Sequence, residues 1–279
     1  MRLRAPAKVN WALNVTGVRE NGYHELDMLM QTVELHDTLE LEEDERLSLT
    51  CGREDVPCDE RNLVMRAARA LQAACGCEKG ARMRLVKRIP AQAGLGGGSS
   101  DCAAALKGLN ELWGLRLGEE RLREIGLRLG ADVPFCLTGG LCRARGLGEV
   151  LTPLPSRRRQ VLLVKPAQGL STPEVFHAFD RLGGPDAGDI EAAARALALG
   201  DDELLARSAR NMLTDAAISL CPEVRETLCA LRELGASFCA MSGSGSACLA
   251  LFPEKRFPTK EELCLFPSFC LPTYTTPRV

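Results

Sequence analysis

The chain has 279 residues, of which 46% are hydrophobic and 26% charged, and its net charge is −2. This composition supplies a sizeable core and excludes global disorder. The near-neutral charge and the 4% aromatic content argue against a nucleic-acid-binding surface. No apolar stretch is long enough for a transmembrane helix, and no signal peptide is recognisable. We therefore expect a cytoplasmic protein of one or two domains, without a membrane or nucleic-acid partner.

Thirteen cysteines and three histidines are scattered along the chain without a Cys-x-x-Cys pair. A structural zinc site is therefore poorly supported, and a disulfide framework suits shorter, secreted chains. We expect most of the cysteines to be small buried hydrophobes in a reducing compartment. We expect neither a structural metal nor a tightly bound cofactor.

The N-terminal half begins with a clear alternation of apolar and polar residues over 3–15, which predicts a half-buried strand. Lys8 and Asn10 fall together on the face of this strand that points away from the core. Asn21-Gly22 predicts a turn. Further elements are expected as strands at 28–41, 46–50 and 81–89, the last ending at Pro90, and as a helix at 62–74.

The C-terminal half follows a proline- and arginine-rich connector at 151–160, which predicts a domain boundary. We therefore expect domains at 1–155 and 156–279. Before this connector, helices are expected at 102–113 and 119–129. After it, helices are expected at 190–199, 202–210 and 222–234, and strands at 161–164, 238–241 and 247–252. Residues 253–279 contain five prolines and show no clear periodicity.

The strongest indication of chemistry is the loop at 90–100, between an expected strand and an expected helix. Its glycines let backbone N–H groups approach an anion, and the next helix adds free N–H groups and its positive dipole end. The loop lacks the lysine of a Walker A loop and does not form a dinucleotide fingerprint. The alternative is a flexible turn with Ser99 or Ser100 as helix cap. The expected phosphate-binding residues are Pro90, Ala91, Gln92, Ala93, Gly94, Leu95, Gly96, Gly97, Gly98, Ser99 and Ser100.

Three other features each have two interpretations. The Ser/Gly segment 241–247 either adds backbone donors for a phosphate or is only a tight hairpin. Asp132 is either a general base for an alcohol or the N-cap of a short helix with Pro134 in its first turn. Lys8 is either a cation for developing charge or a solvated lysine. A phosphate loop needs both a base and a cation nearby, which favours the functional interpretation of Asp132 and Lys8.

Four segments in this order resemble the GHMP kinases: 5–10, 94–100, 130–132 and 242–245. The resemblance implies an α+β fold of two domains, with an N-terminal ATP-binding domain like domain 2 of ribosomal protein S5. The C-terminal domain is expected to be α/β-plait-like, with the active site in the cleft between the two. The resemblance also implies an ATP-dependent small-molecule kinase that uses Mg²⁺ with ATP and is a monomer or weak homodimer.

Within this family, segments 21–26, 132–135 and 171–176 favour one substrate class. They imply phosphorylation of a tertiary hydroxyl on a cytidine-diphosphate-linked methylerythritol, in the non-mevalonate route to isoprenoids. The alternatives are another GHMP kinase of homoserine or mevalonate type, and a non-catalytic ligand sensor. Retention of both Lys8 and Asp132 speaks against the sensor.

The resemblance also assigns roles to single residues. It makes Asp132 the base, and Lys8 the residue that orients Asp132 and offsets charge. Asn10 is expected to contact the substrate near the acceptor. His24 is otherwise an ordinary loop histidine and Phe176 an ordinary core aromatic. In the remaining assignments, the cytidine pocket is formed by Tyr23, His24 and Phe176, and the ATP adenine and ribose lie near Asn62 and Lys87.

Three features depart from the family's pattern. Gln92 and Ala93 stand where the phosphate loop usually begins with glycines. The run at 211–214, Asn-Met-Leu-Thr, replaces a more usual run of Asn, acid, Leu and acid. The tail at 253–279 lacks the pattern of the helix and final strand expected there.

Overall fold

The computed structural model describes residues 1–253, 256–264, 266 and 269–277. The chain forms two compact units, each built from three separate segments of sequence. Strands β1 (Arg2–Val18) and β2 (His24–Asp44) each contribute residues to both units. The segments of unit 1 are Met1–Ala7, Leu35–Ile89 and Gly96–Gly139, and those of unit 2 are Lys8–Glu34, Pro90–Leu95 and Gly140–Val279.

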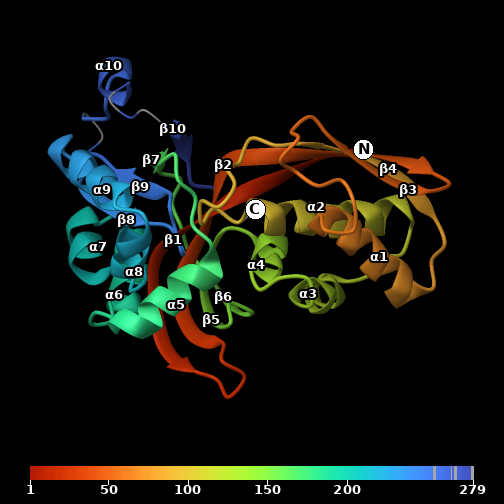
Figure 1. Ribbon diagram of the computed structural model, residues 1–279, viewed down its shortest axis with the longest axis horizontal. Coiled ribbons are helices and arrows are strands. Elements are labelled where there is room, and N and C mark those ends of the chain that lie inside the picture. Colours follow the sequence, from red (N-terminus) through yellow and green to blue (C-terminus); the bar gives the residue numbers. More distant parts are fainter. Residues whose placement is uncertain (254–255, 265, 267–268, 278–279) are drawn as a thin grey trace. The chain divides into compact units, whose positions relative to one another are not determined.

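Unit 1 combines a sheet with four helices. The second half of β2 pairs antiparallel with β4 (Gly80–Val86), and β4 pairs parallel with β3 (Leu47–Cys51). Helix α2 lies along this sheet (Figure 1), and a Cβ at its Gly108 would overlap the Leu41 side chain of β2. Helix α2 also packs on α1 and α4. The helices are α1 (Leu63–Cys75), α2 (Gly97–Leu112), α3 (Glu119–Leu127) and α4 (Val133–Thr138).

Unit 2 contains a four-stranded antiparallel sheet in the order β10-β7-β9-β8. Its strands are β7 (Gln160–Lys165), β8 (Phe238–Met241), β9 (Cys248–Leu251) and β10 (Phe269–Tyr274). The first half of β2 pairs in this unit with β5 (Leu141–Gly146), which in turn pairs with β6 (Val150–Leu154).

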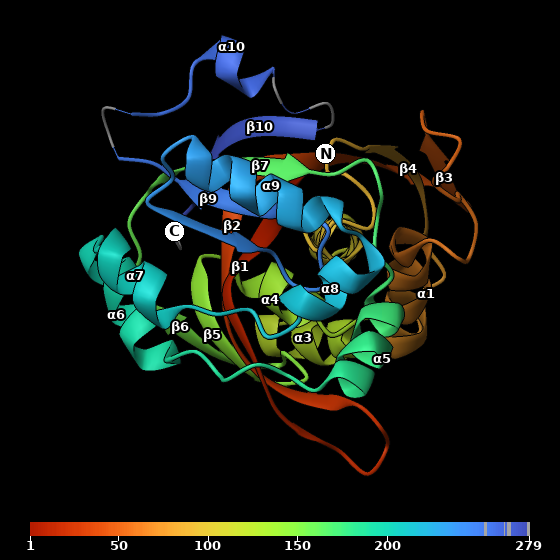
Figure 2. The ribbon, with the colours of Figure 1, turned by 60° about the vertical axis from the view of Figure 1, so that its left-hand side comes forward.

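Helices of unit 2 cover the four-stranded sheet and one another. Helix α9 packs against β8 and β9 (Figure 2), while α5 packs against α8 and α6 against α7. The six helices are α5 (Thr172–Leu182), α6 (Ile190–Leu199), α7 (Asp202–Ser208), α8 (Thr214–Leu220), α9 (Glu223–Glu233) and α10 (Lys260–Leu263).

The expected strands and helices are largely present, with instructive exceptions. The strand expected to reach Pro90 ends at Val86, because Asp37 accepts the backbone N–H groups of Arg88 and Ile89 in place of a neighbouring strand. The connector at 151–160 contains most of β6, whose Pro153 is tolerated because β5 is the one strand that β6 pairs with among the described residues. Helices α5 and α8 were not expected.

The expectation that the tail lacks a helix and a final strand is wrong. Thr259 and Glu262 form a capping box that starts α10, and β10 pairs with β7 along its whole length. Strand β10 is an edge strand and contains Pro272, so its sequence need not alternate. Parts of the expected tail lie outside the described residues: 254–255, 265, 267–268 and 278–279.

Candidate active site

Lys8 and Asn10 are held together on β1 in unit 2. Lys8 Nζ donates a 2.7 Å hydrogen bond to Asn10 Oδ1. Both residues are buried, at 5% and 1% exposure, so β1 is covered on both faces here, and the expected half-buried strand is wrong at this point. A buried ammonium requires a polar partner, and Asn10 supplies one. Lys8 is therefore a buried, hydrogen-bonded residue, and its interpretation as a solvated lysine is wrong.

The Ser/Gly segment between β8 and β9 reaches this pair. The Asn10 backbone N–H donates to Ser242 Oγ at 3.1 Å, and that hydroxyl donates to the Gly94 carbonyl at 3.0 Å. Asn211 Nδ2 donates to the carbonyls of Met241 and Gly243, both at 2.8 Å. Asn211 therefore holds the Ser/Gly segment in place, and it is the residue of the run at 211–214 that keeps the family's usual start.

The first half of the phosphate loop, 90–95, belongs to unit 2 and is fixed by its backbone. The Ala93 carbonyl accepts the Ala247 N–H at 3.1 Å, and the Leu95 carbonyl accepts the Lys8 N–H at 3.0 Å. Gly94 has a φ of +70°, and a Cβ there would overlap the Ser242 carbonyl oxygen. Only glycine fits this position without displacing the neighbouring loop.

The second half of the loop belongs to unit 1 and opens helix α2. Gly96 is the N-cap of α2, with φ +67° and no side chain to cap the first N–H groups. The expected alternative of Ser99 or Ser100 as the cap is therefore wrong. Ser100 is buried and its hydroxyl donates to the Pro6 carbonyl at 2.7 Å. The uncapped N–H groups and the helix dipole make this helix start suited to an anion.

Asp132 lies in unit 1 at the start of α4. It is the N-cap residue of α4, Pro134 lies in the first turn, and the Asp132 side chain makes no capping hydrogen bond. The carboxylate is half-buried. The turn before it lies beside α2, since a Cβ at Gly130 would be 3.7 Å from Ser99 Oγ. Asp132 thus occupies the N-cap position of the alternative interpretation, but its carboxylate does not make the capping hydrogen bond.

Lys87 is enclosed by two carboxylates. Its Nζ pairs with Asp101 Oδ2 at 2.6 Å and also with Asp37 Oδ2. Burial lowers the pKa of Lys87, but the two carboxylates outweigh this effect and raise the pKa overall. Burial raises the pKa of Asp101 to about 7, and Lys87 only partly opposes the rise. A Cβ at Gly97 would lie 3.3 Å from Lys87 Nζ, so the cluster adjoins the start of α2.

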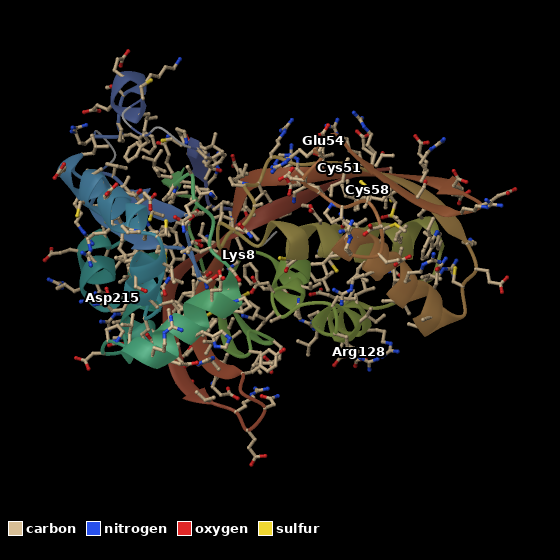
Figure 3. All side chains as sticks on the ribbon, in the orientation of Figure 1. Lys8, Cys51, Glu54, Cys58, Arg128 and Asp215 are labelled. Carbon is tan, nitrogen blue, oxygen red and sulfur yellow. The ribbon has the colours of Figure 1, made fainter. Side chains whose placement is uncertain are left out.

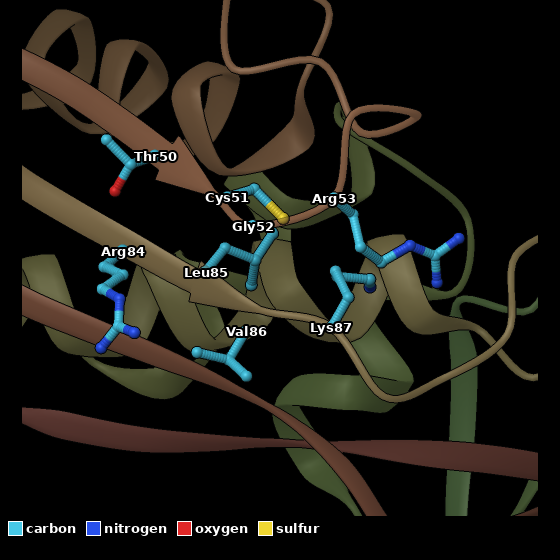
Figure 4. A pocket seen from close by; sticks show the side chains of 8 residues that line it. All are labelled: Thr50, Cys51, Gly52, Arg53, Arg84, Leu85, Val86 and Lys87. Atoms are coloured by element: carbon cyan, nitrogen blue, oxygen red, sulfur yellow. The ribbon is translucent and has the colours of Figure 1, made fainter.

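A pocket of about 480 Å³ lies beside this cluster, where β3 and β4 end. In Figure 4, Arg53 and Lys87 lie at one end of the pocket and Arg84 at the other. Its volume falls within the usual range for small-molecule sites. Sequence reasoning found only Lys87 here, because the β3 residues carry no motif. The lining residues are Thr50, Cys51, Gly52, Arg53, Arg84, Leu85, Val86 and Lys87.

Asn62 caps helix α1, which follows the pocket-lining segment 50–53 in the sequence. Its Oδ1 accepts the Val64 N–H at 2.9 Å, and its Nδ2 donates to the Pro57 carbonyl at 2.7 Å. Both ends of the amide therefore fix the loop between β3 and α1. A contact with the nucleotide stays a prediction.

His24 and Phe176 come together in unit 2. Their rings stack with centroids 4.6 Å apart and an interplanar angle of 25°. Phe179 meets the His24 ring edge-on, and Asp180 Oδ1 lies 2.7 Å from His24 Nε2. Tyr23 is 63% exposed and makes no aromatic contact with the described rings. Sequence reasoning missed Phe179 and Asp180 because α5 was not recognised as a helix.

All thirteen cysteines lie in the described residues, and none of them is part of a disulfide. Five are buried, so the expectation that most are buried is wrong. Cys51, the last residue of β3, and Cys58, on the segment between β3 and α1, are labelled in Figure 3. Within the described residues, no three His, Cys, Asp or Glu side chains gather to hold a metal ion. No described helix is long and apolar enough to cross a membrane.

Comparison with known proteins places the chain in a family. The model of the GHMP kinase N-terminal domain matches residues 62–140, and that of the C-terminal domain matches 192–262. A relative from Paramagnetospirillum magneticum is 45% identical over 258 residues, covering 91% of this chain and 89% of its own length. One from Pelotomaculum thermopropionicum is 44% identical over 250 residues, covering 88% and 87%. Both are named 4-diphosphocytidyl-2-C-methyl-D-erythritol kinase.

Solved structures agree with this placement. A crystal structure of 4-(cytidine 5'-diphospho)-2C-methyl-D-erythritol kinase has a TM-score of 0.83 and 35% identity and covers 99% of each chain. The homoserine kinase from Cytophaga hutchinsonii has a TM-score of 0.74 at 20% identity, covering 100% of this chain and 95% of its own, and shows the shared fold alone.

The chain belongs to the GHMP kinase family, and within it to the group of relatives named 4-diphosphocytidyl-2-C-methyl-D-erythritol kinase. The expected α+β fold of this family is confirmed, as is the expectation of an ATP-dependent small-molecule kinase. The domain boundary expected at residue 155 stays a prediction.

Proposed function

We propose that this chain transfers the γ-phosphoryl group of ATP to the 2-hydroxyl of 4-diphosphocytidyl-2-C-methyl-D-erythritol. The products are the 2-phosphate and ADP, in the non-mevalonate route to isopentenyl diphosphate. The observation that carries the proposal is the start of α2: its N-terminal N–H groups have no side-chain cap, and Lys87 beside it lines a pocket of nucleoside size. The names of the relatives supply the acceptor.

For ATP, we assign the phosphates to the loop at 90–100 and the nucleoside to the pocket beside Lys87. Backbone N–H groups at a helix start bind phosphate through hydrogen bonds and through the helix dipole. Lys87 lies beside Gly97, so the nucleoside pocket adjoins the helix start that holds the phosphates. Cys51 and Arg53 join Lys87 as residues that bind the nucleoside.

For the chemical step, we assign Asp132 as the base and Lys8 as the cation. Asp132 takes the proton of the acceptor hydroxyl, which requires a carboxylate that is not spent on capping α4. Lys8 offsets charge that develops during transfer, and its bond to Asn10 fixes its position. Asn10 keeps the expected role of contacting the substrate near the acceptor. Phosphoryl transfer needs such positioning and electrostatic stabilisation more than covalent chemistry.

For the cytidine moiety, we assign His24, Phe176 and Tyr23. A ring spacing of 4.6 Å leaves no room for a base between His24 and Phe176, since stacked rings need about that spacing for each layer. The base therefore does not insert between these two rings; it meets the edge of the His24 ring, and Tyr23 provides a ring that stacks on it. The exposure of Tyr23 fits a side chain that moves onto the base when substrate binds.

Mg²⁺ enters as part of the Mg-ATP substrate and is held mainly by phosphates and water. The Ser100 hydroxyl donates its proton to the Pro6 carbonyl, which leaves its oxygen lone pairs to face a ligand. We propose a cytoplasmic enzyme, monomeric or weakly dimeric, without nucleic-acid or membrane partners.

Product analysis by ³¹P NMR tests this proposal. Incubation with Mg-ATP and the cytidylyl compound should yield ADP and one new phosphomonoester resonance, while the diphosphate linkage of the acceptor stays intact. A new resonance with homoserine or mevalonate, and none with the cytidylyl compound, would replace the proposed acceptor. ATP binding without transfer to any acceptor would favour the sensor.

A further inference from the structure

Helix α5 holds His24 through three side chains on one of its faces. Phe176, Phe179 and Asp180 are spaced i, i+3 and i+4, so they project from the helix together. Phe176 stacks on the imidazole, Phe179 meets its edge, and Asp180 Oδ1 lies 2.7 Å from Nε2. His24 is 9% exposed, so this arrangement fixes both the plane and the rotation of the ring.

The hydrogen bond to Asp180 determines which ring nitrogen carries the proton. A carboxylate can only accept, so His24 Nε2 must be the donor. In the neutral imidazole the other nitrogen, Nδ1, then has no proton and is an acceptor. Among the described residues, the His24 ring makes a single hydrogen bond, the one from Nε2 to Asp180. Its Nδ1 is therefore available to a ligand.

We propose that Asp180 is a positioning residue that fixes His24 as its Nε2–H tautomer, so that Nδ1 accepts a hydrogen bond from the substrate's base. This inference rests on the proposed function, because it takes the ligand of the His24 site to be a pyrimidine. Asp180 acts through His24, and its own carboxylate need not touch the substrate.

A fixed acceptor selects the kind of base that binds. Cytosine has an exocyclic amino group that donates to such an acceptor, whereas uracil has a carbonyl at the same place. With uracil, the carbonyl and His24 Nδ1 are both acceptors, so neither forms a hydrogen bond. Leaving a buried polar group unpaired costs more binding free energy than weakening a hydrogen bond. Asp180 therefore favours cytidylyl over uridylyl compounds by holding the proton on Nε2.

NMR of the ligand-free protein tests the tautomer directly. The chain has three histidines, so ¹⁵N-histidine labelling gives three ring spectra, and the one that disappears in His24→Ala belongs to His24. At pH 8, the wild-type protein should show a protonated Nε2 and a bare Nδ1. In Asp180→Ala, both nitrogen shifts should move towards a tautomer average. A wild-type ring protonated on Nδ1, or unchanged shifts in Asp180→Ala, would overturn the proposal.

Kinetics test the consequence for substrate. Asp180→Ala should raise KM for the cytidylyl compound about tenfold, the usual effect of losing one hydrogen bond to a charged group, with kcat within twofold. Asp180→Asn retains an acceptor oxygen and should recover part of this loss. The matched control is Glu174→Ala, which removes an exposed carboxylate from the same helix and should leave KM unchanged.

The discrimination between cytidylyl and uridylyl compounds should also fall in Asp180→Ala. Equal kinetics of Asp180→Ala and wild type, or an equal loss in Glu174→Ala, would overturn the role of Asp180 while the proposed function stands. If the wild-type protein does not turn over the cytidylyl compound, the proposed function is wrong, and the ligand-free NMR result then decides the role of Asp180 by itself.

Discussion

Lys87 and Asp101 form a buried ion pair, with Nζ 2.6 Å from Oδ2. Asp37 pairs with the same ammonium group, so two carboxylates share one cation beside the first turn of α2. Asp101 Oδ1 is buried and has no hydrogen-bond partner among the described residues. The cluster thus holds a carboxylate that is poorly compensated, and burial raises the pKa of Asp101 to about 7.

We predict that Asp101 makes stability fall as pH rises towards neutrality. The folded protein keeps the Asp101 proton up to about pH 7, whereas the unfolded chain releases it near its ordinary pKa of 3.8. Between these values the folded state binds more protons, so raising the pH lowers the free energy of unfolding. Asp101→Asn removes this titration and should make the decline shallower in urea denaturation between pH 4.5 and 8. Equal pH slopes for variant and wild type would contradict the raised pKa.

Replacement of the proposed base should separate chemistry from binding. Asp132→Asn keeps the shape of the side chain but cannot take a proton at neutral pH. We expect kcat to fall about 10²–10⁴-fold, the usual contribution of a general base, while the Kd values for ATP and acceptor change little. Stopped-flow turnover together with calorimetric binding measures both quantities. A kcat within a few-fold of wild type would remove Asp132 from the mechanism.

The close approach of Gly94 to the Ser242 carbonyl predicts a strong effect of one methyl group. Gly94→Ala adds both left-handed strain and an overlap with that oxygen, so KM for ATP should rise more than about tenfold and Tm should fall. The matched control is Gly22→Ala, with φ +81° and nothing within 4 Å of the added Cβ. It carries the strain alone and should leave KM for ATP unchanged. Similar KM values for the two variants would mean that the overlap does not matter for ATP.

Arg53 tests the assignment of the pocket to the nucleoside. Arg53→Ala should raise KM for ATP about three- to tenfold, since it removes a donor that lines the pocket, and should leave KM for the acceptor unchanged. Arg61 offers a comparison, because it pairs with Asp59 as Arg53 pairs with Asp55 but does not line the pocket. Arg61→Ala should therefore behave like wild type. A rise in KM for the acceptor instead of ATP would move the pocket to the other substrate.

The sequence predicts those parts of the fold that local signals specify. Helix α6 has the expected bounds at 190–199, and α1 begins one residue after the expected start at 62, with Asn62 as its cap. The loop at 90–100 could be identified as a candidate phosphate-binding loop because its glycines and the following helix are neighbours in sequence. Helix α5 also carried signals, a proline in its first turn and Gly183 at its end, although they were not used.

The remaining features depend on contacts between distant segments. Asp37 lies 50 residues before Lys87, and Asp180 lies 156 residues after His24. An isolated aspartate in a sequence is more often solvated, so nothing local identifies either partner. Strand β10 is defined by its pairing with β7, over 100 residues earlier, and not by its own pattern.

A coupled ADP-release assay with Mg-ATP tests the central claim most directly. It compares 4-diphosphocytidyl-2-C-methyl-D-erythritol with the same polyol phosphate without cytidine, and with homoserine and mevalonate. We expect turnover with the cytidylyl compound alone. Equal or faster turnover with an acceptor that lacks cytidine would contradict the proposed substrate and the roles of His24 and Phe176.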